Sequence, residues 1–468
     1  MVAAEPSLAE HPALAGVRAQ LRRWARFAPY LLSDADEAAL AAANRALVSE
    51  QLALLQSLEA DESTSLAAAD QALRDLDAGS AERRRAADAV AHACTDRRAP
   101  QAAAVLGALA RCHLDDDRQR GIDDWRTRFA FVQGTTPATL AHLRDATRLA
   151  SGLAGQWWQT RAALVGGEYS DRRVGLVAPA ATLQTHASMA ADALAAAVPL
   201  LADGARAAAA RITPGADNQV VIEADGRISA TVAHRPTPRG SLMVAHELGH
   251  ALHALESRSP EPPGALVGET VACWASLVAG RRYAADASVP AEAAAAAALA
   301  LGDTLVEELF VSAAVSAFED AAYAITQGGH PATVDDLDAA WLTAHRDLLG
   351  AQVPVPAHVG SGWARLPSLA TDPGHACSYV WATVLALAVV GRYGSSDSAV
   401  VATAIRAGGI EADEFTALLG FDGAEWIEEG LAALAEELAR LAHILGPLLP
   451  GTPPGTPPGT STAPPAPG

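Results

Sequence analysis

The residues best suited to chemistry in this chain are His246, Glu247 and His250, in the run Val244-Ala245-His246-Glu247-Leu248-Gly249-His250. On a helix, residues four positions apart share one face, so His246 and His250 are expected to bind the same zinc ion. Zinc lowers the pKa of a bound water from about 15.7 to roughly 7. Glu247, beside the metal, is then placed to accept that water's proton as a general base.

A catalytic zinc site has three protein ligands and an open position, and Glu269 in Gly268-Glu269-Thr270 is the best candidate for the third. The stretch from Ser257 to Gly264 is rich in turn-forming residues, and an apolar helix is predicted over 266–280. We therefore predict one zinc ion per chain, held by His246, His250 and Glu269. The alternative is two core histidines and a surface glutamate.

The composition favours a large globular protein with a buried core. The chain has 468 residues, 50% of them hydrophobic, and a formal net charge of −20. An acidic surface repels phosphate backbones and anionic lipids, so neither nucleic acid nor membrane is expected as a partner. The four cysteines are widely spaced and no secretory signal is evident, which favours the cytoplasm. The oligomeric state is left open.

Hydrophobic periodicity predicts a mainly α-helical chain with two helical lobes. An N-terminal lobe is expected over 1–170, with helix starts at Ser33 and Thr136, and a catalytic region over 171–445. The exception is 219–233, where Asp225-Gly226 between β-forming runs predicts a hairpin just before the zinc helix. Such a hairpin either offers a peptide a strand edge or serves as a structural ribbon. Residues 446–468, rich in Pro, Gly and Thr, are predicted to be a disordered tail.

With these motifs in view, the chain resembles the thimet oligopeptidase and oligoendopeptidase F family of zinc metallopeptidases. The resemblance rests on four segments: HELGHALH at 246–253, Gly268-Glu269-Thr270, Ala317-Phe318-Glu319 before Gly328-Gly329, and Leu418 to Asp422 with Trp426 and Gly430. It implies an elongated α-helical body with a deep channel, zinc at the channel floor, and short unfolded peptides as substrates.

The chain departs from the family in the segment 363–381, where family members carry a histidine and tyrosines that donate hydrogen bonds to the developing oxyanion. Here the segment reads WARLPSLATDPGHACSYVW. His375 and Tyr379 are the donors that remain, so we expect them to take the catalytic hydrogen-bonding role. Loss of one such donor costs other enzymes roughly 100- to 1000-fold in rate.

Three interpretations therefore stay open: a general metalloendopeptidase, a dedicated processing peptidase for one precursor peptide, and a catalytically weak zinc- or peptide-binding homologue. Retention of Glu247 argues against the last. His253 is expected either to support a zinc ligand or to pack, rather than to bind zinc itself. Glu307, Glu308 and Glu319 are all candidates for orienting a zinc-ligating histidine, and the sequence does not choose among them.

Overall fold

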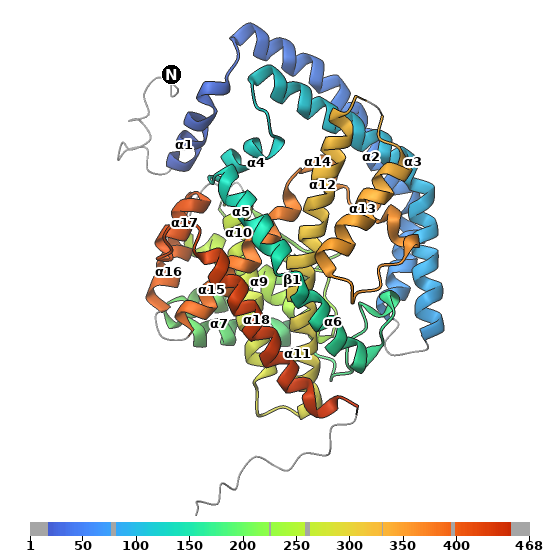
Figure 1. Ribbon diagram of the computed structural model, residues 1–468. Coiled ribbons are helices and arrows are strands. Elements are labelled where there is room, and N and C mark those ends of the chain that lie inside the picture. The colour runs from blue at the N-terminus through green and yellow to red at the C-terminus, as the bar shows by residue number, and fades with distance from the viewer. Residues whose placement is uncertain are drawn as a thin grey trace, which may run out of the picture.

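The computed structural model describes residues 17–75, 81–223, 226–257, 263–329, 331–394 and 398–450, with side chains 19, 55 and 58–75 excepted. These residues form eighteen α-helices and one small sheet, which confirms the mainly α prediction (Figure 1). The N-terminal helices are α1 (Arg18–Phe27), α2 (Asp34–Asp75), α3 (Ala81–Arg120), α4 (Trp125–Gln133), α5 (Pro137–Leu149) and α6 (Gly152–Val165). Next come α7 (Leu183–Ala197) and α8 (Ala202–Ala209).

The remaining helices follow the sheet. They are α9 (Pro238–Ser257), α10 (Ala265–Ala284), α11 (Ala291–Val306), α12 (Ser312–Gln327), α13 (Val334–Leu349), α14 (Ser368–Thr371), α15 (His375–Tyr393), α16 (Ser398–Arg406), α17 (Ala412–Leu418) and α18 (Trp426–Leu445). A π-helical turn, η7 (Glu307–Val311), joins α11 to α12, and a 3-10 segment, η8 (Ala357–Arg365), follows α13.

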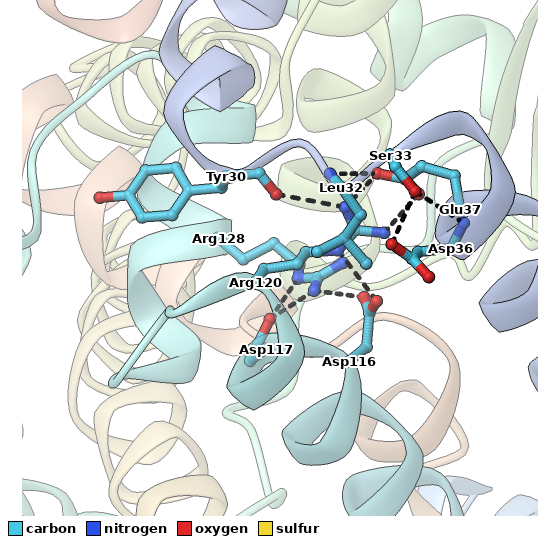
Figure 2. Close-up of polar contacts among 9 residues, drawn as sticks. All are labelled: Tyr30, Leu32, Ser33, Asp36, Glu37, Asp116, Asp117, Arg120 and Arg128. Atoms are coloured by element: carbon cyan, nitrogen blue, oxygen red, sulfur yellow. Dashed lines mark hydrogen bonds and ion pairs between the residues drawn. The ribbon is translucent and has the colours of Figure 1, made fainter.

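The long helices α2 and α3 form an arm along one side of the molecule (Figure 1). Arg120, the last residue of α3, binds Glu37 in the first turn of α2. Its two terminal nitrogens donate to the Glu37 carboxylate at 2.6 and 2.8 Å (Figure 2). This bidentate hydrogen bond lowers the pKa of Glu37 to about 2. Arg128 donates to Asp117 at 2.8 Å and extends the network to α4. Glu37 near the start of α2 therefore meets the end of α3, so the two helices run antiparallel.

Two predicted helix starts are confirmed. The backbone N–H of Asp36 donates to the Ser33 hydroxyl at 3.2 Å, and that of Thr139 donates to the Thr136 hydroxyl at 3.1 Å. Each side chain therefore satisfies one of the amide groups that a helix N-terminus leaves without an intrahelical partner.

The sheet has three strands, β1 (Ile212–Pro214), β2 (Gln219–Ile222) and β3 (Ile228–Val232), in the order β1-β3-β2. β2 and β3 pair antiparallel with Val220 opposite Ala230, which confirms the predicted hairpin beside the zinc helix; Ala224 and Asp225 of its turn lie outside the described residues. β1 pairs parallel to β3 and was not predicted. β1 has only three residues and ends in a proline, so it is too short to show the alternation of apolar and polar residues that predicts a strand.

The core is built on α9, α10, α15 and α18, which pack against one another. One hydrophobic cluster extends from Ala99 to Leu445, so residues before and after 170 contribute to it. At the α15–α18 contact, a Cβ on Gly430 would lie 2.1 Å from the Val384 carbonyl oxygen, so only glycine permits this approach. The division into lobes at residue 170 stays a prediction.

Helix α15 is the one described helix long and apolar enough to cross a membrane by length and composition alone. Most of its side chains are buried between α10 and α18. The first three residues of the predicted disordered tail, Gly446–Leu448, instead form a 3-10 turn that extends α18. Residues 451–468 lie outside the described residues.

Candidate active site

The candidate site forms where α9 and α10 approach closely. A Cβ on Gly249 would lie 2.7 Å from the Ala272 Cα atom and 2.9 Å from the Val271 carbonyl oxygen, so a side chain here would push the helices apart. On either side of Gly249 along α9, His246 and His250 present rings whose centroids are 4.9 Å apart. Glu269, in the second turn of α10, faces both rings.

The three side chains converge as metal ligands do. Nε2 of His246 lies 3.3 Å from Glu269 Oε2, and Nε2 of His250 lies 3.6 Å from Glu269 Oε1. Two atoms each about 2.1 Å from one tetrahedral ion are separated by roughly 3.4 Å. The observed separations therefore match what a zinc ion bound at this point requires, and the structure brings together all three predicted ligands.

The ionisation of these groups shows that the site attracts positive charge. Burial disfavours protonation of His246, but the Glu269 carboxylate outweighs it and raises the pKa of His246 to about 9. Burial, with the adjacent His246, lowers the pKa of His250 to about 4. Burial would raise the pKa of Glu269, yet its contacts with the two histidines bring the pKa below the usual value. In the absence of a metal, one proton on His246 balances the buried carboxylate.

Glu269 provides a direct test of whether a metal fits. Its Oε2 atom is buried and makes no well-aligned hydrogen bond with the described residues, although Nε2 of His246 lies 3.3 Å away. A buried carboxylate oxygen without a donor is costly, and coordination to a cation removes that cost. Two imidazoles and one carboxylate are also the donor set of many catalytic zinc sites. The residues present therefore fit zinc.

Glu247 lies next to the ligands and lines the same cleft. It is buried, and burial raises the pKa of its carboxyl group to about 7. A carboxylate whose pKa lies near neutrality can both accept and return a proton at little cost. This is the ionisation behaviour that the predicted general base needs.

The two predicted hydrogen-bond donors occupy different positions. Tyr379 lines the cleft, with its ring stacked 6.3 Å from that of His246. Burial raises the pKa of Tyr379 well above its usual value, so its hydroxyl keeps its proton. His375 begins α15 and packs edge-on against Tyr379, with centroids 5.3 Å apart, but does not line the cleft. Its Nδ1 lies 3.3 Å from Asp372, which raises its pKa.

The cleft in front of these residues has a volume of about 1020 Å³. Its lining includes strand β2, from Gln219 to Ile222, and Gly268 and Glu269 of α10. Within the described part of the sheet, β2 pairs only with β3, so its other edge is unpaired. An unpaired edge beside the zinc residues can hydrogen-bond to an extended chain.

The structure separates the three glutamates that the sequence left equivalent. Glu308 has a carboxylate oxygen within 4.8 Å of both a ring nitrogen of His246 and the Cys273 sulfur. Glu307 instead pairs with Arg239, and Glu319 accepts from the Gly374 N–H at 3.0 Å at the start of α15. Of the three glutamates, Glu308 is therefore the one that lies beside His246. Sequence reasoning missed Cys273, because a lone cysteine carries no motif.

His253 lies outside this cluster. Its side chain is buried, and burial lowers its pKa to about 4. Neither group of converging ligand atoms around His246 includes it. The position fits the packing role expected from the sequence.

The fold is that of a class of helical peptidases, the oligoendopeptidase F structures, as the sequence resemblance predicted. Oligoendopeptidase-F from Enterococcus faecium superposes with a TM-score of 0.72 at 15% identity, over 93% of this chain and 79% of that chain. A candidate peptidase from Chlamydophila abortus gives a TM-score of 0.77 at 14% identity, over 94% of this chain and 79% of that one. PZ peptidase A, solved with an inhibitor, gives a TM-score of 0.71 at 14% identity, over 94% of this chain and 83% of that one.

At these identities the likeness is one of fold. No protein-family model matches the chain, and no curated protein matches it in sequence. What the chain does must therefore be argued from its own site.

Proposed function

We propose that this chain is a zinc-dependent endopeptidase that hydrolyses short, unfolded peptides. One observation carries the proposal. His246, His250 and Glu269 place their ligand atoms within 4.8 Å of one another at a cleft that Glu247 also lines. A site that only stored zinc would need no buried carboxylate beside the ligands. The peptidase structures that share the fold support the same reaction class.

The substrate class follows from the cleft. An extended peptide can add as a further strand to the free edge of β2, whose residues Val220 to Ile222 line the cleft. Backbone hydrogen bonds of this kind need no particular side chain, so they favour unfolded peptides of varied sequence. A folded protein cannot present an isolated strand to this edge, and we expect folded proteins to be poor substrates.

His246, His250 and Glu269 would hold the zinc ion. When bound, zinc supplies a Lewis acid that polarises the peptide carbonyl and acidifies water. Glu247 accepts the proton of the attacking water and passes it to the leaving amine. The Tyr379 hydroxyl, kept protonated by burial, donates a hydrogen bond to the developing oxyanion. His375 packs against Tyr379 and fixes the orientation of its ring.

The proposed site of action is a reducing compartment, the cytoplasm. All four cysteines, Cys94, Cys112, Cys273 and Cys377, are free thiols. In an oxidising compartment a protein of this kind would more commonly use them in disulfides.

The test is digestion of a mixed library of short peptides by the purified protein, by a chelator-treated sample and by Glu247→Gln. Glu292→Gln, an exposed glutamate on α11, is the matched control. We expect cleavage by the wild type and the control only. Zinc bound at one per chain without cleavage of any library peptide would contradict a general peptidase and favour a dedicated processing enzyme. Equal cleavage by Glu247→Gln would reject the proposed mechanism.

A further inference from the structure

A second group of two histidines and one carboxylate lies away from the zinc cleft, where α3 packs against η8. Asp88 and His92 are four residues apart on α3 and so share one face of the helix, and His358 approaches them from η8. These three residues are called the α3–η8 cluster below. None of them lines the zinc cleft.

The geometry of the α3–η8 cluster repeats that of the zinc residues. The Asp88 carboxylate lies 3.2 Å from Nε2 of His358 and 3.7 Å from Nε2 of His92, each through a different oxygen. The corresponding distances at the zinc cleft are 3.3 and 3.6 Å, also through different oxygens. The two imidazole rings lie 5.0 Å apart at 74°, compared with 4.9 Å and 81° at the cleft. In both groups the three ligand atoms lie within 4.8 Å of one another.

His92 is a buried polar side chain without a partner. Its side chain is 7% exposed, and neither ring nitrogen has a hydrogen-bond partner among the described residues. The 3.7 Å separation from Asp88 is too long for a hydrogen bond. A buried imidazole without partners is costly, and coordination of a metal ion by Nε2 would reduce that cost. His358 is 53% exposed, so an ion can reach the cluster from solvent.

Arg172 is the competing cation at the α3–η8 cluster. Its Nη1 donates to Asp88 Oδ1 at 3.1 Å and to the Tyr169 carbonyl at 2.9 Å. Asp88 Oδ2, which faces His358, is the other oxygen of the same carboxylate. A carboxylate that binds a metal through one oxygen is commonly held by a hydrogen bond to the other. Arg172 can therefore orient Asp88 without taking the oxygen that an ion needs.

The charges around the α3–η8 cluster determine how tightly it would hold an ion. Burial, with smaller effects of Arg172 and Arg365, lowers the pKa of His92 to about 4, so the ring is neutral, as a metal ligand must be. The same two arginines repel a divalent ion, whereas the zinc cleft adds the Glu247 carboxyl group beside its ligands. We therefore expect the cluster to bind an ion at least about tenfold more weakly than the cleft does.

We propose that the α3–η8 cluster is a second metal site, which binds zinc or a similar first-row divalent ion and thereby cross-links α3 to η8. Two imidazoles and one carboxylate suit such ions better than they suit magnesium or calcium, which prefer oxygen ligands alone. An ion at this point would fasten the arm formed by α2 and α3 to the rest of the molecule and stabilise the fold. The proposal does not rest on the proposed function, because the two groups share no residue.

The test uses the full-length protein carrying His246→Gln and His250→Gln, which removes two ligands of the zinc cleft. Zinc titration in competition with a chromophoric chelator measures how many ions bind, and thermal unfolding measures stability. We expect one zinc ion per chain to remain, and added zinc to raise the melting temperature, because an ion bound by the folded state alone stabilises it. The wild type should bind two zinc ions per chain with different affinities. Magnesium and calcium should leave the melting temperature unchanged.

His358→Gln, added to this protein, locates the site. Because His358 is half-exposed, its substitution leaves the core intact, and we expect it to abolish both zinc binding and the zinc-dependent rise in melting temperature. His92→Gln should have the same effect on the response to zinc, whatever its own stability. Asp96→Asn is the matched control, since Asp96 accepts a hydrogen bond from Ser361 and also joins α3 to η8, but lies outside the cluster. It should keep the full response to zinc.

Three results would overturn the proposal. The first is no zinc bound at sub-millimolar free zinc once the cleft ligands are replaced. The second is binding that persists in both His358→Gln and His92→Gln, which would mean an adventitious ion elsewhere. The third is binding that appears only with Arg172→Gln, which would make the Arg172 guanidinium the native partner of Asp88. All three are read from zinc content and melting temperature, so loss of the proposed peptidase function would leave them unchanged.

Discussion

Nε2 of His246 lies 3.3 Å from Oε2 of Glu269 across the contact between α9 and α10. The contact holds a buried carboxylate against a buried imidazole, and a proton or a metal ion must supply the balancing positive charge.

Glu269→Gln keeps the shape of this side chain and removes its charge. We expect zinc affinity to fall by more than the roughly 10- to 100-fold that loss of an outer-shell partner costs. Competition with a chromophoric chelator measures the affinity, with Glu292→Gln as the control on an exposed helix position. Unchanged zinc affinity in Glu269→Gln would mean that the third ligand lies elsewhere.

Glu308→Gln tests whether this residue orients His246. Since Glu308 lies near a ring nitrogen of His246 without facing the cleft, we expect zinc affinity to fall roughly 10- to 100-fold while zinc still binds at one per chain. Glu307→Gln is the matched control, because Glu307, the residue before Glu308 on η7, pairs with Arg239 instead. If both variants bind zinc equally well, Glu308 does not support the site.

Gly249→Ala tests the close approach of α9 and α10. Alanine favours a helix by about 1 kcal/mol over glycine, but its Cβ would lie 2.7 Å from Ala272 Cα, and overpacking costs about 1–3 kcal/mol. We expect a lower melting temperature and weaker zinc binding, because His250 moves away from Glu269.

Gly107→Ala is the control for this variant. A Cβ at Gly107, within α3, meets no atom within 4 Å, so this substitution should raise the melting temperature. A rise of similar size for Gly249→Ala would show that the two helices have room to spare.

Tyr379→Phe removes the hydroxyl and keeps the ring that stacks near His246. We expect kcat to fall roughly 100- to 1000-fold with little change in KM or zinc content, because the lost hydrogen bond forms chiefly in the transition state. Tyr283→Phe on α10, whose buried hydroxyl has no partner among the described residues, should leave kcat unchanged. If kcat of Tyr379→Phe stays within about twofold of the wild-type value, another group donates the hydrogen bond.

His345 makes stability depend on pH. It is 2% exposed, and burial lowers its pKa to about 4 from 6.5, although its Nδ1–H donates to the Trp341 carbonyl at 2.9 Å. The unfolded chain therefore binds a proton between these pH values and the folded chain does not. The free energy of unfolding should fall as pH falls from about 6.5 to 4, by up to about 3 kcal/mol for this residue.

Urea unfolding at pH 7.5, 6 and 5 measures this dependence. His345→Gln should show a flatter fall of stability with decreasing pH than the wild type, whatever its absolute stability. The same slope in both proteins would mean that His345 is protonated in the folded state.

The sequence by itself determined the helices and the side chains that carry the chemistry. Ser33 and Thr136 mark helix starts through local hydrogen bonds, and the hairpin at 219–232 follows from alternation around a turn. The positions of His246, Glu247 and His250 follow from the period of one helix. All of these rest on interactions within a few residues along the chain.

Tertiary structure decided what depends on contacts between distant segments. It brought Glu269 to the two histidines. It also placed Glu308, and neither Glu307 nor Glu319, beside His246 and Cys273, a contact between segments far apart in the sequence. It placed Tyr379 in the cleft and His375 behind it. It also brought His358 of η8 beside Asp88 and His92 of α3, a contact that no local pattern in the sequence could indicate.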